Sequence, residues 1–517
     1  MILPPRNLRL IGGPPQRRTP RTAISLLAAL GLMVAAQPGQ ARQAPASEAP
    51  APAPAPTIQA PAALAEDFAV LRAALEEADG GVYRRRSKAE IEKAFDAAAS
   101  RLVSPMDTIA FYRAVAPAVA AIQDGHTSLS LPEALTVELR RSAPALPLRM
   151  MISGDRLFVL RDLTAAPAQG ADALAGREIR SINGQPVKRI LALLRAAQPG
   201  DGAITTGRDH SLGAGLRLNF QHLVLIGAAE TYRIEFGGVR PRPVLLPGRP
   251  IADLDRTWAE RFPEDRAQRP PAELAFEGDV AVLTLRSFEG SADLAETQPM
   301  TAFLKSAFQE MKTRGARALV LDVRGNGGGQ DELGRDLLSY LLDQPFSYYD
   351  GIYVSRLAFS FAEHSNPPGP IPDQLVTRDA GGRLRWAEHP NYGRHQPAPE
   401  HFAGPVVVLM NGGSFSTTAE FLSVLHSQRR ATFVGEEAGG AYSGNSSGPT
   451  LSVTLPNTAL RLRVPLWRYE LAVDGSRDPD RGVRPDHPVV PGAADILAGR
   501  DPAMERALGL ARHASFP

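Results

Sequence analysis

The sequence predicts a multidomain α/β protein with a helical N-terminal domain, a mostly β region and a C-terminal α/β core. Three observations lead to this fold class. Apolar residues recur at helical spacing between residues 62 and 122, and short alternating runs follow as far as residue 236. From about residue 272, short apolar runs alternate with helical segments. At 517 residues and 44% hydrophobic content, the chain has enough material for two or three domains.

Charge and cysteine content exclude several classes of function. The chain has 57 lysines and arginines against 55 aspartates and glutamates, so it lacks the basic excess that nucleic-acid binding requires. It contains no cysteine, which excludes disulfides, thiolate zinc sites and thiol nucleophiles. A covalent nucleophile in this protein must therefore be a hydroxyl, an amine or a carboxylate.

Residues 1–41 are predicted to be a secretory signal peptide. Arg17, Arg18 and Arg21 precede the apolar run 23–36, and small residues follow up to Ala41. A membrane anchor is the competing interpretation, but this run is shorter than the ~20 residues that span a bilayer. We therefore expect export to the periplasm or the extracellular space, with no stable membrane span after cleavage. Residues 44–61 alternate alanine and proline, and residues 42–61 are predicted to form a linker.

Two regions are expected before the core. Residues 62–123 should form a domain of about three helices, with Leu64, Phe68 and Leu71 on one helical face. Residues 142–240 contain alternating runs at 156–160 and 232–236, which predict strands. Within this region, 174–187 resembles the G-D-x-I-x-x-I-N-G-x-x-V stretch of PDZ domains, although Arg177 stands in place of the aspartate. An unrelated strand–turn–helix is the alternative, and 199–224 fits no expected PDZ element.

The α/β core is placed at residues 265–493. Buried strands are predicted at 280–285, 318–322 and 405–410, and helices at 299–314, 331–342 and 417–428. A helical tail is expected at 494–517. Because chemistry in α/β folds is usually placed at the carboxyl ends of the strands, the loops after the second and third strands are the candidate site.

These two loops carry unusual residues. The first, 322–330, has four glycines in five positions, which lets backbone amides approach a ligand closely. It lacks the Gly-Lys-Ser/Thr of a phosphate loop, so an oxyanion hole fits better. The second, 411–421, places Ser414 and Ser416 between a strand and a helix, where a serine is either a nucleophile or a helix cap.

Other candidates come from elsewhere in the chain. Ser446 lies in a Gly-x-Ser-x-Gly pattern, but a flexible loop rather than a strand precedes it. His126 follows a predicted helix in the segment Asp-Gly-His-Thr, where it is either a catalytic base or a surface turn residue.

Five separated motifs together resemble the C-terminal processing (tail-specific) proteases and their Tricorn-core relatives. They lie at 124–129 (DGHTSL), 319–329 (LVLDVRGNGGG), 406–421 (VVVLMNGGSFSTTAEF), 431–440 (ATFVGEEAGG) and 481–491 (RGVRPDHPVVP). The resemblance covers most of residues 64–493 and implies a crotonase/ClpP-like core with Ser416 as nucleophile. Glu420 stands one position later than this family leads us to expect, so Thr417 and Ser414 remain alternatives.

The resemblance also separates two branches of the family. The tail-specific branch uses a serine–lysine dyad, but Ala441 stands where the lysine is expected and no lysine follows Lys312. The Tricorn-like branch uses a histidine from an early motif, which His126 matches, and a later glutamate, for which Glu470 is the candidate. Gly125 replaces the hydroxyl residue that relays between them, so Glu470 must act directly or through water, and Asp124 is its nearest rival.

The implied reaction is peptide-bond hydrolysis through an acyl-enzyme. Ser416 attacks, His126 moves the proton, and the amides of Thr417 and of Gly328 or Gly329 bind the oxyanion. The PDZ-like region would bind a peptide end by strand addition. The expected partner is a peptide or unfolded protein, and no metal or organic cofactor is called for.

Two other functions remain open. The retinoid-binding protein of the eye shares this type of core, so the chain could instead be an inert envelope protein that binds a peptide or an apolar ligand. It could also be a scaffold that uses only its PDZ-like region. The residues give no indication of substrate identity or oligomeric state. Asp322 and Arg324 are expected to brace the glycine loop by hydrogen bonds.

Overall fold

The computed structural model describes residues 57–165, 173–238, 242–477 and 479–513. The predicted signal peptide and most of the predicted linker lie outside these residues. Residues 52–517 form one compact unit. Within the described residues, no helix combines the length and the apolar character that crossing a membrane requires.

The first region is helical, as predicted. It contains α2 (Pro61–Ala78), α3 (Lys88–Ala99) and α4 (Thr108–Ala120). Leu64, Leu71 and Leu75 of α2 are fully buried, as their helical spacing predicts. Helix α3 begins at a capping box in which Ser87 and Glu90 bond to each other's backbone. The chain leaves α4 through Gln123, at a positive φ of 62°, and enters the loop that holds His126.

The second region combines a sheet with more helix than the sequence predicted. The strand order is β3-β4-β5-β7-β8, all pairs are antiparallel, and β6 is added to β5. The strands are β3 (Leu148–Ser153), β4 (Arg156–Asp162), β5 (Glu178–Ile182), β6 (Gln185–Pro186), β7 (Thr231–Phe236) and β8 (Val244–Pro247). Asn183 and Gly184 form the predicted turn between β5 and β6, both with positive φ.

Three helices belong to the same region: α6 (Val187–Ala196), α7 (Thr205–Gly213) and α8 (Arg217–Leu225). The expectation of a mostly β region was therefore wrong for residues 199–224. In α7 the only buried apolar residue is Leu212, and α8 buries the polar residues Asn219 and His222 together with its apolar ones, so neither helix has a purely apolar stripe. Around this region lie the short elements α5 (Glu133–Ser142), β2 (Pro144–Ala145), β9 (Arg249–Pro250) and α9 (Ile251–Arg261).

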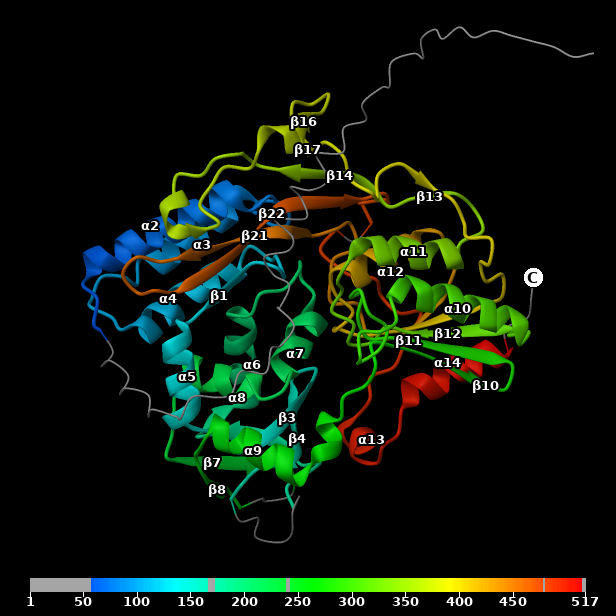
Figure 1. Ribbon diagram of the computed structural model, residues 1–517. Coiled ribbons are helices and arrows are strands. Elements are labelled where there is room, and N and C mark those ends of the chain that lie inside the picture. The colour runs from blue at the N-terminus through cyan, green and yellow to red at the C-terminus, as the bar shows by residue number, and fades with distance from the viewer. Residues whose placement is uncertain (1–56, 166–172, 239–241, 478, 514–517) are drawn as a thin grey trace, which may run out of the picture. The chain divides into compact units, whose positions relative to one another are not determined.

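The core sheet has the order β10-β11-β12-β19-β20-β23 and is parallel except for β10 (Figure 1). Its strands are β10 (Ala272–Glu277), β11 (Val280–Leu285), β12 (Ala318–Asp322), β19 (Val406–Met410), β20 (Thr432–Gly435) and β23 (His487–Pro488). The helices between them are α10 (Met300–Thr313), α11 (Asp331–Leu341) and α12 (Thr417–Ser427). The three predicted strands and three predicted helices of the core are thus confirmed.

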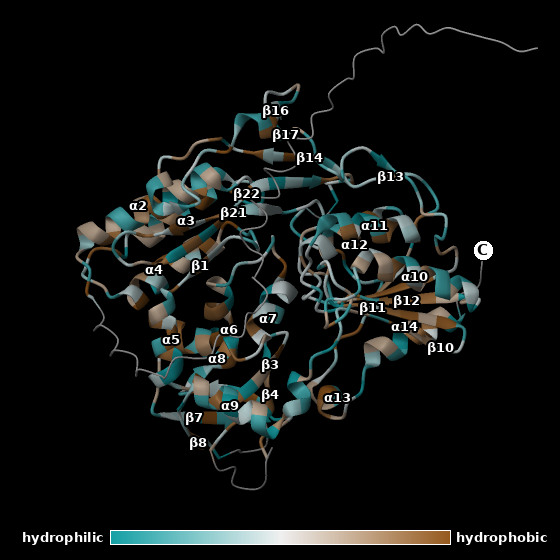
Figure 2. Ribbon diagram, in the orientation of Figure 1, coloured by the Kyte–Doolittle hydropathy of each residue, from teal (hydrophilic) through white to brown (hydrophobic). Residues whose placement is uncertain are grey.

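Helices cover both faces of this sheet, and Figure 2 shows its strands coloured as hydrophobic between them. One face packs with α10, α11 and α12 through residues such as Leu283, Leu321 and Val408. The alternate residues, including Val320 and Leu409, pack against α14 (Pro502–His513). The predicted C-terminal helical tail, which also contains α13 (Ala493–Leu497), is therefore part of the core.

A further sheet has the order β15-β21-β22-β14-β17-β16, and β1 (Ser128–Ser130) pairs with β22. Its strands are β14 (Tyr349–Val354), β15 (Ser365–Asn366), β16 (Val376–Arg378), β17 (Leu384–Trp386), β21 (Ser446–Thr454) and β22 (Arg461–Leu471). The pair β13 (Phe346–Ser347) and β18 (Arg394–His395) stands apart. Buried Asp67 of α2 accepts hydrogen bonds from the amides of Asn457 and Thr458, which anchors the β21–β22 hairpin to the helical region.

Candidate active site

Ser416 stands between the buried strand β19 and helix α12 in a strained conformation. Its φ is 54° and its ψ is −130°, a combination that non-glycine residues rarely adopt. The side chain makes no capping hydrogen bond to α12, so the helix-cap interpretation does not hold for this serine. Strain at a strand–helix turn is a recurrent way to expose a hydroxyl for attack.

His126 lies 290 positions away in sequence and meets Ser416 directly. The distance from His126 Nε2 to Ser416 Oγ is 3.0 Å, which is hydrogen-bonding distance. The end of α4 positions the histidine on one side, and the pairing of β1 with β22 positions it on the other. The structure therefore brings together the two residues that the sequence selected as nucleophile and base.

Phe415 holds the histidine ring in place. The two rings are stacked, with centroids 4.6 Å apart and an interplanar angle of 29°. A Cβ on Gly125 would lie 2.7 Å from Phe415 Cζ, so the stacked ring excludes any side chain at that position. Burial lowers the pKa of His126 to about 4, which leaves the imidazole neutral at pH 7.

The other ring nitrogen faces carboxylates. His126 Nδ1 is buried and has no hydrogen-bond partner among the described residues. Asp124 Oδ1 lies 3.9 Å from it, at the distance of an ion pair rather than of a hydrogen bond. The same carboxylate accepts hydrogen bonds from the His126 amide and from the Thr127 hydroxyl. Burial, together with Asp79 and Asp201, raises the pKa of Asp124 well above its usual value.

Two buried aspartates that the sequence did not single out hold this loop. Asp201, from the loop before α7, accepts hydrogen bonds from the amides of Gly125 at 2.7 Å and Ala441 at 3.0 Å. Asp79, at the end of α2, accepts one from the Thr127 hydroxyl at 2.8 Å. Burial raises the pKa of Asp79 to about 6. Both residues act across long sequence separations, and no local pattern marks either of them.

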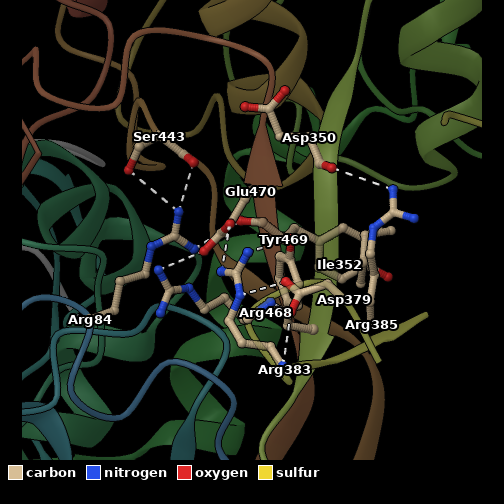
Figure 3. Close-up of polar contacts among 12 residues, drawn as sticks. Arg84, Asp350, Ile352, Asp379, Arg383, Arg385, Ser443, Arg468, Tyr469 and Glu470 are labelled. Carbon is tan, nitrogen blue, oxygen red and sulfur yellow. Dashed lines mark hydrogen bonds and ion pairs between the residues drawn. The ribbon is translucent and has the colours of Figure 1, made fainter. Parts of the chain in front are cut away.

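Glu470 does not meet His126. Its carboxylate pairs with Arg468 at 2.7 Å and with Arg383 at 3.4 Å, and Figure 3 shows it among these arginines. Side chains alternate along β22, so Tyr469 and Leu471 are buried while Glu470 points to the opposite face. Ser128 of β1 pairs with Arg463, seven residues before Glu470. The carboxylate nearest to Nδ1 is that of Asp124, the rival candidate.

The glycine loop lies against the nucleophile. A Cβ on Gly328 would lie 2.7 Å from Ser416 Cβ and 3.0 Å from the Thr417 amide nitrogen. The Gly328 amide, however, donates to Asn326 Oδ1 at 3.0 Å, so it is not free to bind an oxyanion, contrary to that prediction. Among the described residues the Gly329 amide has no backbone acceptor in a turn or loop, and Thr417 begins α12, where amides lack intrahelical acceptors.

Side chains brace these two amides. The Thr417 hydroxyl donates to the Gly329 carbonyl at 2.8 Å, which ties the two loops together. The Arg324 guanidinium forms two hydrogen bonds with Asp322 and two with Asp501, all between 2.7 and 2.9 Å. The expected bracing by Asp322 and Arg324 is present, and Asp501 extends it to the start of α14.

The rival serines have structural contacts. Ser414 is fully buried, donates to the Val323 carbonyl and accepts from the Asn411 amide, so its hydroxyl shapes the turn. Ser446 begins β21 and is 4% exposed, with its hydroxyl near Asp79 and Asp124. Neither serine has a histidine partner in the described structure. Ser416 is the one that does.

One group of side chains near this site has the residue types of a metal site. One ligand atom each from Asp124, His126 and Asp201 lies within 4.8 Å of the others. It is the one group of this kind among the described residues. The set combines one imidazole nitrogen with two carboxylate oxygens.

Comparisons with known proteins agree with this architecture. Residues 279–489 match the family model of peptidase family S41. No curated protein sequence matches the chain. Mature CPAF is similar in structure, with a TM-score of 0.54 at 16% identity over 84% of this chain and 94% of CPAF.

Two further CPAF structures are similar at the same 16% identity. The complex of mature CPAF with lactacystin has a TM-score of 0.58 over 87% of this chain and 97% of that chain. A point mutant of CPAF has a TM-score of 0.59 over 88% of this chain and 98% of that chain. At this identity the likeness concerns the fold alone. Residues 279–489 of the chain therefore form a domain that matches peptidase family S41.

Proposed function

We propose that this protein hydrolyses peptide bonds through an acyl-enzyme formed on Ser416, with His126 as general base. The observation that carries the proposal is the 3.0 Å contact between Ser416 Oγ and His126 Nε2 in a strained strand–helix turn. Because His126 is neutral at pH 7, its Nε2 lone pair is available to accept the serine proton.

The reaction proceeds in two acyl transfers. Ser416 Oγ attacks the substrate carbonyl as its proton passes to His126 Nε2, and the new oxyanion binds the amides of Gly329 and Thr417. The imidazolium then gives the proton to the leaving amine. A water molecule, deprotonated by His126, attacks the acyl-enzyme and releases a new carboxylate and the free serine.

Buried carboxylates support the transient imidazolium. Asp201 raises the pKa of His126 against the larger effect of burial, and Asp124 lies 3.9 Å from Nδ1. We assign Asp124 the part of the third residue, acting across this gap or through one water molecule. Glu470, with its arginine partners, has no comparable position.

The substrates are peptides, and we propose that the PDZ-like region, residues 142–240, binds an extended peptide end. Its sheet has two edge strands, β3 and β8, that are open to strand addition. A cavity of about 850 Å³ is lined by β3, α7 and the ends of β19 and β20. A peptide bound in this cavity would leave Ser416 and His126 in place.

Turnover of an unstructured reporter protein such as casein tests this function. The wild-type chain should cleave it, and Ser416→Ala and His126→Ala should each reduce cleavage to the level of buffer. Ser306→Ala is the matched serine control and should retain turnover, because the exposed Ser306 hydroxyl bonds only to carbonyls of its own helix. Equal turnover in all variants would contradict the proposed roles of Ser416 and His126. Tight peptide binding without any turnover would instead favour the inert binding protein or the scaffold.

We also propose that the protein is exported to the periplasm or beyond, on the evidence of the arginines and apolar run in residues 1–41. Expression in a bacterial host followed by N-terminal sequencing of the processed chain tests this. Processing near Ala36 or Ala41 supports export, whereas an unprocessed chain in the cytoplasmic fraction would refute it.

A further inference from the structure

We propose that a zinc-class divalent cation binds between His126 Nδ1, Asp124 and Asp201 and reversibly inactivates the peptidase. Binding itself is independent of the proposed function. Only its inhibitory consequence rests on His126 acting as the base.

The three ligand atoms already lie close together. They are within 4.8 Å of one another, and the His126 and Asp124 side chains are only 10% and 6% exposed. His126 Nδ1 is buried without a hydrogen-bond partner and faces Asp124 Oδ1 at 3.9 Å. A buried imidazole nitrogen without a partner costs free energy, and a bound cation would remove that cost.

The charges around this point also favour a cation. Asp124 and Asp201 are both buried, and one carboxylate oxygen of each lies within 4.8 Å of the other. Their hydrogen bonds come from the amides of Gly125, His126 and Ala441 and from the hydroxyls of Thr127 and Ser446. Arg84, Arg85 and Arg208 act on these carboxylates from a greater distance, and none of the three forms an ion pair with them among the described residues. A divalent ion between them would convert like-charge repulsion into attraction.

The ligand types select the class of ion. One imidazole nitrogen with two carboxylate oxygens suits Zn²⁺, whereas Mg²⁺ and Ca²⁺ prefer all-oxygen sites. Zn–N and Zn–O bonds are about 2.0–2.2 Å long, so the group must contract around the ion. Each carboxylate needs to supply one oxygen and can keep its other hydrogen bonds.

Binding at Nδ1 would fix the imidazole in the inactive tautomer. A neutral imidazole that gives its Nδ1 lone pair to a metal carries its proton on Nε2. Nε2–H then donates to Ser416 Oγ across the 3.0 Å contact and cannot accept the serine proton. No proton leaves the ring in this step, because the proton moves from Nδ1 to Nε2 as the metal takes the Nδ1 lone pair.

Calorimetry on the metal-free Ser416→Ala protein tests binding without turnover. We expect one Zn²⁺ to bind at this site. Adding His126→Ala or Asp201→Asn should weaken binding by more than about tenfold, since even outer-shell partners of metal ligands are worth ~10–100-fold. Asp343→Asn removes an exposed carboxylate elsewhere and should leave the affinity unchanged. Mg²⁺ should not compete.

Activity and spectroscopy complete the test. Zn²⁺ should abolish reporter cleavage by the wild-type chain, and a chelator should restore it. Nitrogen NMR of His126 in the Ser416→Ala protein should change to the Nε2–H tautomer when Zn²⁺ is added. Thermal unfolding checks that Asp201→Asn folds, and His126→Ala carries the test if it does not.

Two results would overturn the inference. Zn²⁺ affinity that is equal in the Ser416→Ala protein and in its His126→Ala derivative would place the ion elsewhere. Cleavage that is unaffected by saturating Zn²⁺ would remove the inhibitory role. A chain that cleaves nothing even without metal, yet binds Zn²⁺ as described, would refute the proposed function and leave the metal site standing.

Discussion

The rings of Phe415 and His126 are stacked, with centroids 4.6 Å apart. Phe415 is the residue immediately before Ser416. The turn that exposes Ser416 therefore also positions the ring that we propose accepts its proton. Gly125 makes this possible because a side chain there would occupy the space of the Phe415 ring. In this chain the Phe415 ring occupies the space that a hydroxyl side chain at residue 125 would need.

Gly125→Ala should damage catalysis through this contact. The added Cβ would lie 2.7 Å from Phe415 Cζ and 3.0 Å from Asp201 Oδ1, so the ring or the loop must move. We expect a large fall in kcat and a loss of about 1–3 kcal/mol in unfolding free energy, as for other overpacked sites. Steady-state kinetics and chemical denaturation measure both. Gly125→Ala/Phe415→Leu should recover part of the stability, and an active Gly125→Ala enzyme would contradict the account.

The pH profile should reflect the buried imidazole. Because burial lowers the pKa of His126 to about 4, the acid limb of kcat/KM should fall near pH 4 rather than near 6.5. Asp201→Asn removes a charge that raises this pKa, so its acid limb should move to lower pH. Rates between pH 3.5 and 8 on one peptide check both shifts. An acid limb near 6.5 in the wild type would indicate a solvated histidine.

Asp79→Asn should change how stability depends on pH. The folded pKa of Asp79 is about 6 and lies above its usual value, so its contribution to stability is full at low pH and is lost as pH rises through 6. The amide variant cannot ionise. Its melting temperature relative to wild type should therefore be more favourable at pH 8 than at pH 5. Differential scanning calorimetry at the two pH values measures this, and a reversed order would contradict the assignment.

The Thr417 hydroxyl should affect the rate of catalysis because it holds the Gly329 carbonyl in place. Thr417→Val removes the 2.8 Å bond while keeping the shape, and we expect kcat to fall by about 10-fold with little change in KM. This is less than the ~10²–10³ that the loss of an oxyanion donor costs. Thr418→Val is the matched control, because Thr418 Oγ1 is buried without a partner in the described structure. Equal effects of the two substitutions would argue against the tether.

The roles of Asp124 and Glu470 can be distinguished by replacing each carboxylate with its amide. Asp124→Asn removes the charge 3.9 Å from His126 Nδ1 and should lower kcat strongly. Glu470→Gln only loosens contacts with Arg468 and Arg383, so it should leave kcat within a few-fold of wild type. Kinetics on one peptide compares them, with thermal unfolding as the check on folding. A larger loss in Glu470→Gln would restore Glu470 as the third residue.

The core and the catalytic pair could be predicted because their signals are local. Strands such as β12 are apolar on both faces, and the loops after β12 and β19 carry glycine and serine motifs. By contrast, β21 begins in a polar, glycine-rich segment, which does not predict a strand at that point.

The surroundings of the catalytic pair depend on contacts between distant residues. Asp79 and Asp201 reach their positions through packing between regions that are distant in sequence. The Gly328 amide donates to the Asn326 side chain, and the direction of that side chain cannot be predicted from the spacing of residues. The family pattern selected Glu470, but its carboxylate pairs with Arg468 and Arg383.

The most direct test of the central claim is covalent labelling with a fluorophosphonate, followed by peptide mass spectrometry. The account predicts one adduct per chain on Ser416, no adduct in Ser416→Ala, and labelling slowed by orders of magnitude in His126→Ala. An adduct on Ser446 or Ser414, or an unchanged labelling rate without His126, would contradict it.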